Sequence, residues 1–158
     1  MIKTQIIRKT NTSVLNKLMK KIAKIHGQYV SIGYFKEQNL HSEANMPYAN
    51  LLYIHAYGLV DGAPVRDVMG HLKPMIYGTN EESPLIESLL KQFFCNKTTI
   101  EHVFSKIGET YQDKGKAIFG NPTILQASES NPTPLIDTSE LKDNFAYKTS
   151  IRMEVVTR

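Results

Sequence analysis

A run of alternating residues near the end of the printed sequence constrains the fold more than any other feature. From Phe145 to Val155, aromatic or aliphatic side chains and one threonine occupy every second position, and polar or small side chains occupy most of the positions between them. Successive side chains of an extended chain point to opposite faces, so the pattern predicts a half-buried β-strand. The fold must therefore supply a layer that covers one face of a sheet.

The residues just before this strand predict a short helix. Asp137 can act as its N-cap by accepting a backbone N–H, and Glu140, three residues later, can bond back to the N–H of the cap. Leu141 then faces inward. Together Asp137, Glu140 and Leu141 form a predicted structural turn that leads into the strand.

Weaker patterns predict the other elements. Alternation predicts strands at residues 2 to 8 and 29 to 35, and apolar spacings of three and four predict helices that begin near Thr12, Pro47 and Ser83. A further helix is expected behind a capping box of Thr98 and Glu101. We therefore expect an α+β fold, with a mostly antiparallel sheet of about four strands that helices cover on one face.

Two segments show no period. Residues 59 to 80 contain several glycines and prolines and predict an extended arm, while residues 121 to 134 are rich in Pro, Asn, Ser and Thr and predict a loop with little part in the core. A long irregular segment in a compact domain indicates a binding role. A chain of 158 residues that is 41% hydrophobic fits one domain, residues 1 to 158.

Charge is unevenly distributed. The first 30 residues carry seven lysines and arginines and no acidic residue, although the whole chain has a net charge of only +4. This segment could bind an acidic surface of a partner protein, it could bind nucleic acid phosphates, or it could be a solvated helix face with no partner. The basic face of the predicted helix consists of Lys17, Lys20, Lys21 and Lys24.

The sequence offers little support for catalysis or export. The five histidines never pair at helical spacing, and no nucleophile-elbow, phosphate-loop or dinucleotide motif is present. A single cysteine, Cys95, excludes an intramolecular disulfide and a cysteine-based zinc site. No apolar run reaches the ~20 residues of a membrane helix, and no signal-peptide pattern opens the chain. We expect a soluble protein that is not an enzyme and holds no cofactor or metal.

Several short motifs resemble one family. Residues 134 to 141 read Pro-Leu-Ile-Asp-Thr-Ser-Glu-Leu, which is similar to the Pro-Leu-Ile-Asp-Thr-Gly-x-Leu signature of the small neck and tail-completion proteins of tailed bacteriophages. Residues 29 to 35 resemble the early strand of that family, and residues 48 to 58 resemble its helix that ends in glycine. Residues 63 to 66 and 73 to 76 resemble its Pro/Arg segment. The chain departs from the pattern at Ala56, where the family usually has Glu, and at Ser139, where it usually has Gly.

This resemblance implies a structural virion protein of the neck or head-proximal tail, acting as a terminator, completion or connector component. It implies a homo-oligomeric ring, for which we expect six copies, that meets neighbouring neck, connector or tail proteins and lets DNA pass without sequence-specific binding. The protein would lie in the virion, and in the host cytoplasm during assembly, with no membrane partner. The expected interface residues are Pro64, Arg66, Lys73, Pro74, Met75 and Ile76 in the arm, and Pro132 and Pro134 in the loop.

Two other functions stay open at this point. The basic segment also suits a small nucleic-acid-binding protein of a phage, which would lose affinity steeply as salt rises. A phage-encoded enzyme would require polar side chains that converge in a pocket.

Overall fold

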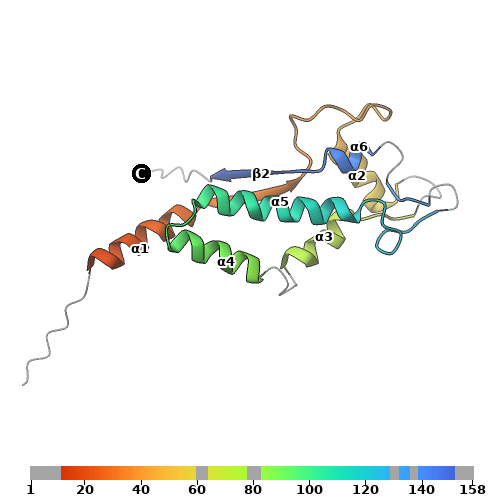
Figure 1. Ribbon diagram of the computed structural model, residues 1–158. Coiled ribbons are helices and arrows are strands. Elements are labelled where there is room, and N and C mark those ends of the chain that lie inside the picture. Colours follow the sequence, from red (N-terminus) through yellow and green to blue (C-terminus); the bar gives the residue numbers. More distant parts are fainter. Residues whose placement is uncertain (1–11, 60–63, 78–82, 129–131, 136–138, 152–158) are drawn as a thin grey trace, which may run out of the picture.

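The computed structural model describes residues 12 to 59, 64 to 77, 83 to 128, 132 to 135 and 139 to 151. In these ranges the chain forms six helices and two strands (Figure 1). In chain order they are α1 (Thr12–Ile25), β1 (Gln28–Gly33), α2 (Tyr48–Tyr57), α3 (Val68–Tyr77), α4 (Ser83–Phe94), α5 (Ile100–Ile118), α6 (Glu140–Asp143) and β2 (Ala146–Ile151). No helix in the described ranges is both long enough and apolar enough to span a bilayer.

Within the described ranges the sheet has two antiparallel strands. β1 pairs with β2 in a register that places Val30 opposite Thr149 and Ile32 opposite Tyr147. Both strands were predicted, and the fold is of the mixed α+β kind, but the expected sheet of about four strands is wrong. The predicted strand at residues 2 to 8 lies outside the described residues.

One long helix explains why two strands suffice. α5 has 19 residues, so it is about 28 Å long and extends past six-residue strands of about 20 Å. The sheet packs on one side of α5, and α3 and α4 pack on the other (Figure 1). α3 and α4 therefore cover the side of α5 that faces away from the sheet.

Two glycines of α5 let the helix approach β2 closely. A Cβ atom on Gly115 would lie 2.2 Å from the aromatic ring of Phe145, and one on Gly108 would lie 2.2 Å from the ring of Tyr147. Phe145 has no exposed surface and also contacts the aromatic rings of Tyr34 and Phe119, each 5.6 Å away between centroids. The inward face predicted for Phe145 and Tyr147 is thus confirmed.

The buried apolar side chains form two clusters along α5. The larger one surrounds Phe145 and the C-terminal half of α5, with Leu52 of α2 and Leu72 of α3 among its members. The smaller one joins α4 to the start of α5 through Leu89, Phe93, Ile100 and Val103. The molecule is therefore elongated, with α1 at one end and α2 at the other (Figure 1).

The predicted extended arm is wrong over residues 68 to 77, which form α3. Val68 and Leu72 are completely buried there, one helical turn apart, and Met75 and Ile76 pack on the same cluster. Gly70 and Pro74 obscured this periodicity in the sequence. Pro74 lies inside α3, where burial of the apolar face compensates for the lost backbone hydrogen bond.

The loop at residues 121 to 134 was expected to contribute little to the core, and this is also wrong. Leu125 and Pro134 are buried, and the N–H of Gly120 donates to the carbonyl of Pro134 at 2.8 Å. The apolar side chains of this loop close the larger cluster at the end of α5.

Helix starts also differ in detail from the prediction. Thr99, and not Thr98, caps α5, because its hydroxyl accepts from the N–H of His102 at 3.3 Å. Asp137 lies outside the described residues, and the N-cap of α6 is Ser139, whose side chain makes no capping bond. Leu141 is buried, as predicted.

Candidate interaction surfaces

α1 carries an apolar face that the described residues leave uncovered. We call this the α1 stripe, and its side chains are between 43% and 59% exposed: Val14, Leu15, Leu18, Met19 and Ile22. Isolated exposed apolar residues are ordinary, but a contiguous stripe of five marks an interaction surface. The same spacing in a core helix would look identical in the sequence, so the sequence could not reveal the exposure.

The C-terminal end of α1 is fixed to the body of the protein. The ammonium group of Lys21 donates to the carbonyls of Phe93 and Phe94, at 3.1 and 2.5 Å, and lies 5.6 Å from the centroid of the Phe93 aromatic ring. Ile25 packs against the smaller cluster. Lys21 thus satisfies carbonyls at the end of α4, where a positive charge also suits the helix dipole.

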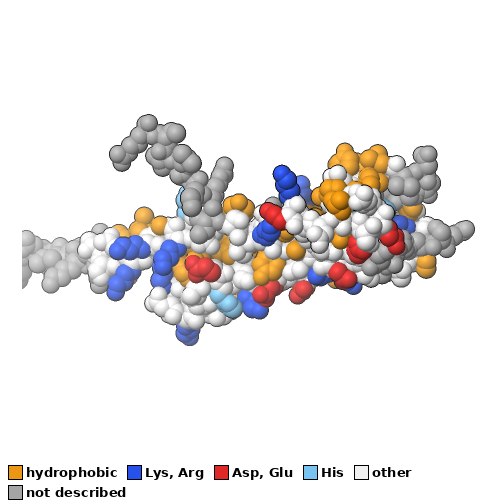
Figure 2. Space-filling model, turned by 90° about the horizontal axis from the view of Figure 1, so that it is seen from above, with side chains coloured by type: hydrophobic (Ala, Val, Ile, Leu, Met, Phe, Trp, Pro, Cys, Tyr) orange, Lys and Arg blue, Asp and Glu red, His pale blue; other side chains and the backbone are white. Residues whose placement is uncertain are grey.

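The other three lysines of the predicted basic face are exposed, namely Lys17, Lys20 and Lys24. Figure 2 shows blue side chains over this end of the molecule. The basic face therefore divides into one lysine that anchors the helix and three that are open to a partner.

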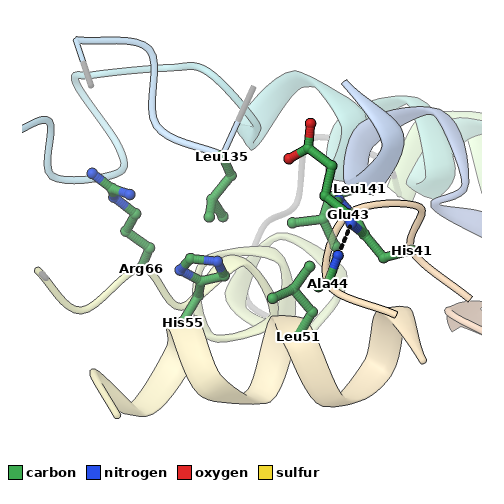
Figure 3. Close-up of a pocket in the computed structure, with 8 residues that line it drawn as sticks. All are labelled: His41, Glu43, Ala44, Leu51, His55, Arg66, Leu135 and Leu141. Atoms are coloured by element: carbon green, nitrogen blue, oxygen red, sulfur yellow. Dashed lines mark hydrogen bonds between the residues drawn. The ribbon is translucent and has the colours of Figure 1, made fainter. Parts of the chain in front are cut away.

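A cavity of about 300 Å³ lies where α2, α6 and three loops meet (Figure 3). Its lining joins residues that no sequence pattern associates: His41, Glu43, Ala44, Leu51, His55, Arg66, Leu135 and Leu141. The Nδ1 atom of His41 accepts from the N–H of Ala44 at 3.2 Å, so the neutral imidazole keeps its proton on Nε2. That atom lies 3.9 Å from a carboxylate oxygen of Glu140.

Glu140 makes long-range contacts that were not predicted, whereas its predicted bond to the N–H of Asp137 lies outside the described residues. Its carboxylate accepts from the N–H of Ser42 at 3.0 Å, from the hydroxyl of Ser42, and from the hydroxyl of Tyr48 at 3.1 Å. These hydrogen bonds, above all those from Ser42, lower the pKa of Glu140. Burial and the bond to this carboxylate raise the pKa of Tyr48. Glu140 therefore ties α6 to the start of α2 and to the loop before it.

We expect Glu140→Gln to lower the melting temperature at neutral pH, because glutamine cannot offer two charged acceptor oxygens. The pKa of Glu140 is lowered from 4.5 in the folded protein, so its contribution is complete above that value and disappears as pH falls through the lower folded pKa. The difference in melting temperature between wild type and variant should therefore shrink below about pH 4.5. Thermal melts at several pH values measure this, with exposed Glu43→Gln as the control. An unchanged difference at low pH would contradict the assigned role.

Arg66 connects the predicted arm to the predicted loop. The residue is 5% exposed, and its guanidinium donates to the carbonyl of Gln126 at 3.0 Å and to the hydroxyl of Ser128 at 3.4 Å. The N–H of Arg66 also donates to the carbonyl of His55. The polar groups around the cavity thus hold loops in place.

The remaining interface candidates differ in accessibility. Lys73, Pro74 and Pro132 are exposed and Pro64 is partly exposed, whereas Pro134 is buried and Met75 and Ile76 pack on the core. The exposed candidates stay a prediction as contacts between copies.

A second hollow, which we call the α2–α3 groove, has a volume of about 520 Å³ and lies at the end of β1, whose Ile32 and Gly33 line it. Its apolar lining includes Tyr53, Tyr57 and Met69, which are exposed by 57%, 64% and 37%. The two tyrosine rings lie 4.5 Å apart. Figure 2 shows hydrophobic side chains gathered over this end of the molecule.

No family model, curated protein or solved structure matches this chain. Function must therefore be inferred from the surfaces described above and from the motif resemblance. In the described ranges, no three His, Cys, Asp or Glu side chains lie close enough to hold a metal ion.

Sequence reasoning missed the α2–α3 groove and the contact of Glu140 with Ser42. α2 was predicted, but Gly70 and Pro74 obscured α3. No sequence signal indicates that two helices leave a hollow between them. Glu140 and Ser42 are far apart in the sequence, and a carboxylate three residues after a capping residue favours the local bond instead.

Proposed function

We propose that this protein is a structural component of a tailed-phage virion, assembling as a homo-oligomeric ring in the neck or at the head-proximal end of the tail. The observation that carries the proposal is the uncovered α1 stripe. Burial of apolar surface favours association by about 25 cal/mol for each Å² that is removed from water. A virion ring is an assembly in which each copy can bury such a stripe.

The backbone at Ser139 supports the resemblance behind this proposal. Ser139 stands where the family signature has glycine, and it adopts φ 58° and ψ −7°. This left-handed conformation costs an L-residue roughly 1–2 kcal/mol, whereas glycine adopts it freely. A glycine signature suits this backbone, and the short α6 then leads into β2, the order that the resemblance implies.

The sheet gives a second line of support. In the described part of the chain, β1 and β2 pair only with each other, so each strand keeps one edge without a β partner. Open edges of this kind favour pairing with another chain, and a closed ring can satisfy them between copies.

The test is the mass of the full chain by light scattering over a range of concentrations, followed by imaging of a labelled copy in assembled particles. We expect one closed oligomer, with six copies favoured, and label at the neck or upper tail. A chain that stays monomeric at every concentration and never appears in a particle would refute the proposal.

The exposed Lys17, Lys20 and Lys24 favour a second candidate, a basic nucleic-acid-binding protein. If these three lysines contact phosphates, DNA affinity should fall about 40-fold between 50 and 200 mM salt. Reversing the three to Glu should abolish that binding and leave ring assembly through the α1 stripe intact. Lys21 is left unchanged in this variant because it anchors α1. Steep salt dependence in a monomeric chain would favour this candidate over the virion ring.

A further inference from the structure

We infer that α1 of one copy docks, through the α1 stripe, into the α2–α3 groove of the next copy. The inference rests on the proposed ring function and names the contact that would build the ring. It assigns one occupant to the groove, namely Leu15, Leu18, Met19 and Ile22 of a neighbouring chain.

The spacing of the α1 stripe suits a groove. Leu15, Leu18, Met19 and Ile22 stand at positions i, i+3, i+4 and i+7, which is the anchor pattern of an amphipathic helix bound in an apolar groove. These anchors span about 10 Å of helix. A hollow of about 520 Å³ lined by tyrosines and a methionine can accept several such side chains.

α1 cannot reach the groove of its own chain. Gly33, the last residue of β1, lines the groove, whereas α1 ends just before the first residue of β1. The strand between them is about 20 Å long, and α1 extends away from it (Figure 1). Since Lys21 and Ile25 fix the C-terminal end of α1 to the body near α4, an α1 that occupies the groove must come from another molecule.

Charge argues against a pair of α1 helices as the alternative contact. α1 carries four lysines and no acidic side chain, so two copies packed stripe to stripe would place like charges along both margins. The groove is lined by one carboxylate, Asp67, and one ammonium group, Lys73. Its nearly neutral rim accepts the basic helix better than a second α1 does.

The two surfaces lie at opposite ends of the elongated molecule (Figures 1 and 2). A contact between two different surfaces is heterologous, and heterologous contacts generate rings when the rotation closes. The arrangement therefore supplies the head-to-tail joint that a ring requires.

Cysteine cross-linking between differently marked copies tests this contact. All chains carry Cys95→Ser, because the native cysteine is exposed. One chain carries Leu18→Cys and the other carries Tyr53→Cys, both at exposed positions where folding should be unaffected. After mixing and oxidation we expect covalent heterodimers, and a chain with both cysteines should form covalent ladders.

Lys20→Cys is the matched control, because it is also exposed on α1 but points away from the α1 stripe. It should give less than a tenth of the cross-linked product. Leu18→Asp and Tyr53→Asp should each raise the concentration for half-assembly at least tenfold, whereas Lys20→Asp should not.

The outcomes separate the inference from the proposed function. Oligomers that form without the Leu18–Tyr53 cross-link would overturn the docking contact and leave the ring proposal standing. Homodimers of the Leu18→Cys chain alone would show pairing of α1 helices and overturn the inference. A protein that stays monomeric under all conditions would overturn both the docking contact and the ring proposal. So would a monomer whose α1 binds vesicles of anionic lipid instead.

Discussion

Phe145→Ala should be the most destabilising single truncation of the larger cluster. The Phe145 side chain has no exposed surface, and its aromatic ring is enclosed by Tyr34, Phe119 and the backbone of α5 at Gly115. Truncating a buried phenylalanine costs about 3–5 kcal/mol through lost burial and the cavity left behind. For a chain of this size the melting temperature should fall by about 6–20 °C.

Chemical denaturation and thermal melts of the two proteins measure this effect. Tyr29→Ala is the matched control, since it removes an aromatic side chain of similar size that is 46% exposed and lies outside the α2–α3 groove. It should cost less than about 1 kcal/mol. Equal losses in the two variants would show that Phe145 does not occupy the centre of the core.

Gly115→Leu should produce the second large effect. A leucine there gains helix propensity, worth at most about 1 kcal/mol. Its Cβ alone would lie 2.2 Å from the Phe145 aromatic ring, which is buried on all sides and has no room to move. The stability lost when α5 is forced away from β2 should exceed the gain from helix propensity. The free energy of unfolding should therefore fall by about 1–3 kcal/mol.

Two further variants test whether the loss comes from the contact between position 115 and Phe145. Ala117→Leu adds a leucine to the same helix at an exposed position and should leave stability almost unchanged. The double variant Gly115→Leu/Phe145→Ala should lose less than the sum of the single losses, because the leucine enters the space that the phenylalanine left. Strictly additive losses would contradict the assigned contact between position 115 and the Phe145 aromatic ring.

Most helices and strands found correctly had an uninterrupted period, and the short α6 was predicted from its capping pattern instead. α1, α2, α4 and α5 and the strands β1 and β2 all had regular spacing between clear start and stop residues. α3 was missed because Gly70 and Pro74 are helix-breaking signals, and only tertiary burial of Val68 and Leu72 makes that segment helical.

The number of strands and the exposure of the α1 stripe could not follow from the sequence. A strand pattern predicts that one face is covered but not by which element, and here α5 covers it with the help of Gly108 and Gly115. A helical apolar face likewise predicts burial without indicating whether the partner belongs to the same chain. The candidate surfaces therefore emerged from the structure, and the family resemblance came from short motifs alone.

The pairing of β1 with β2 also affects how the chain must fold during synthesis. Gly33 pairs with Ala146, so more than a hundred residues separate the two strands in sequence. At ~5–20 residues per second, a ribosome needs roughly 6–20 s to make the intervening chain. Throughout that interval β1 has no β2 to pair with, so nascent chains on neighbouring ribosomes should be prone to aggregate, and slower translation should lower the soluble yield.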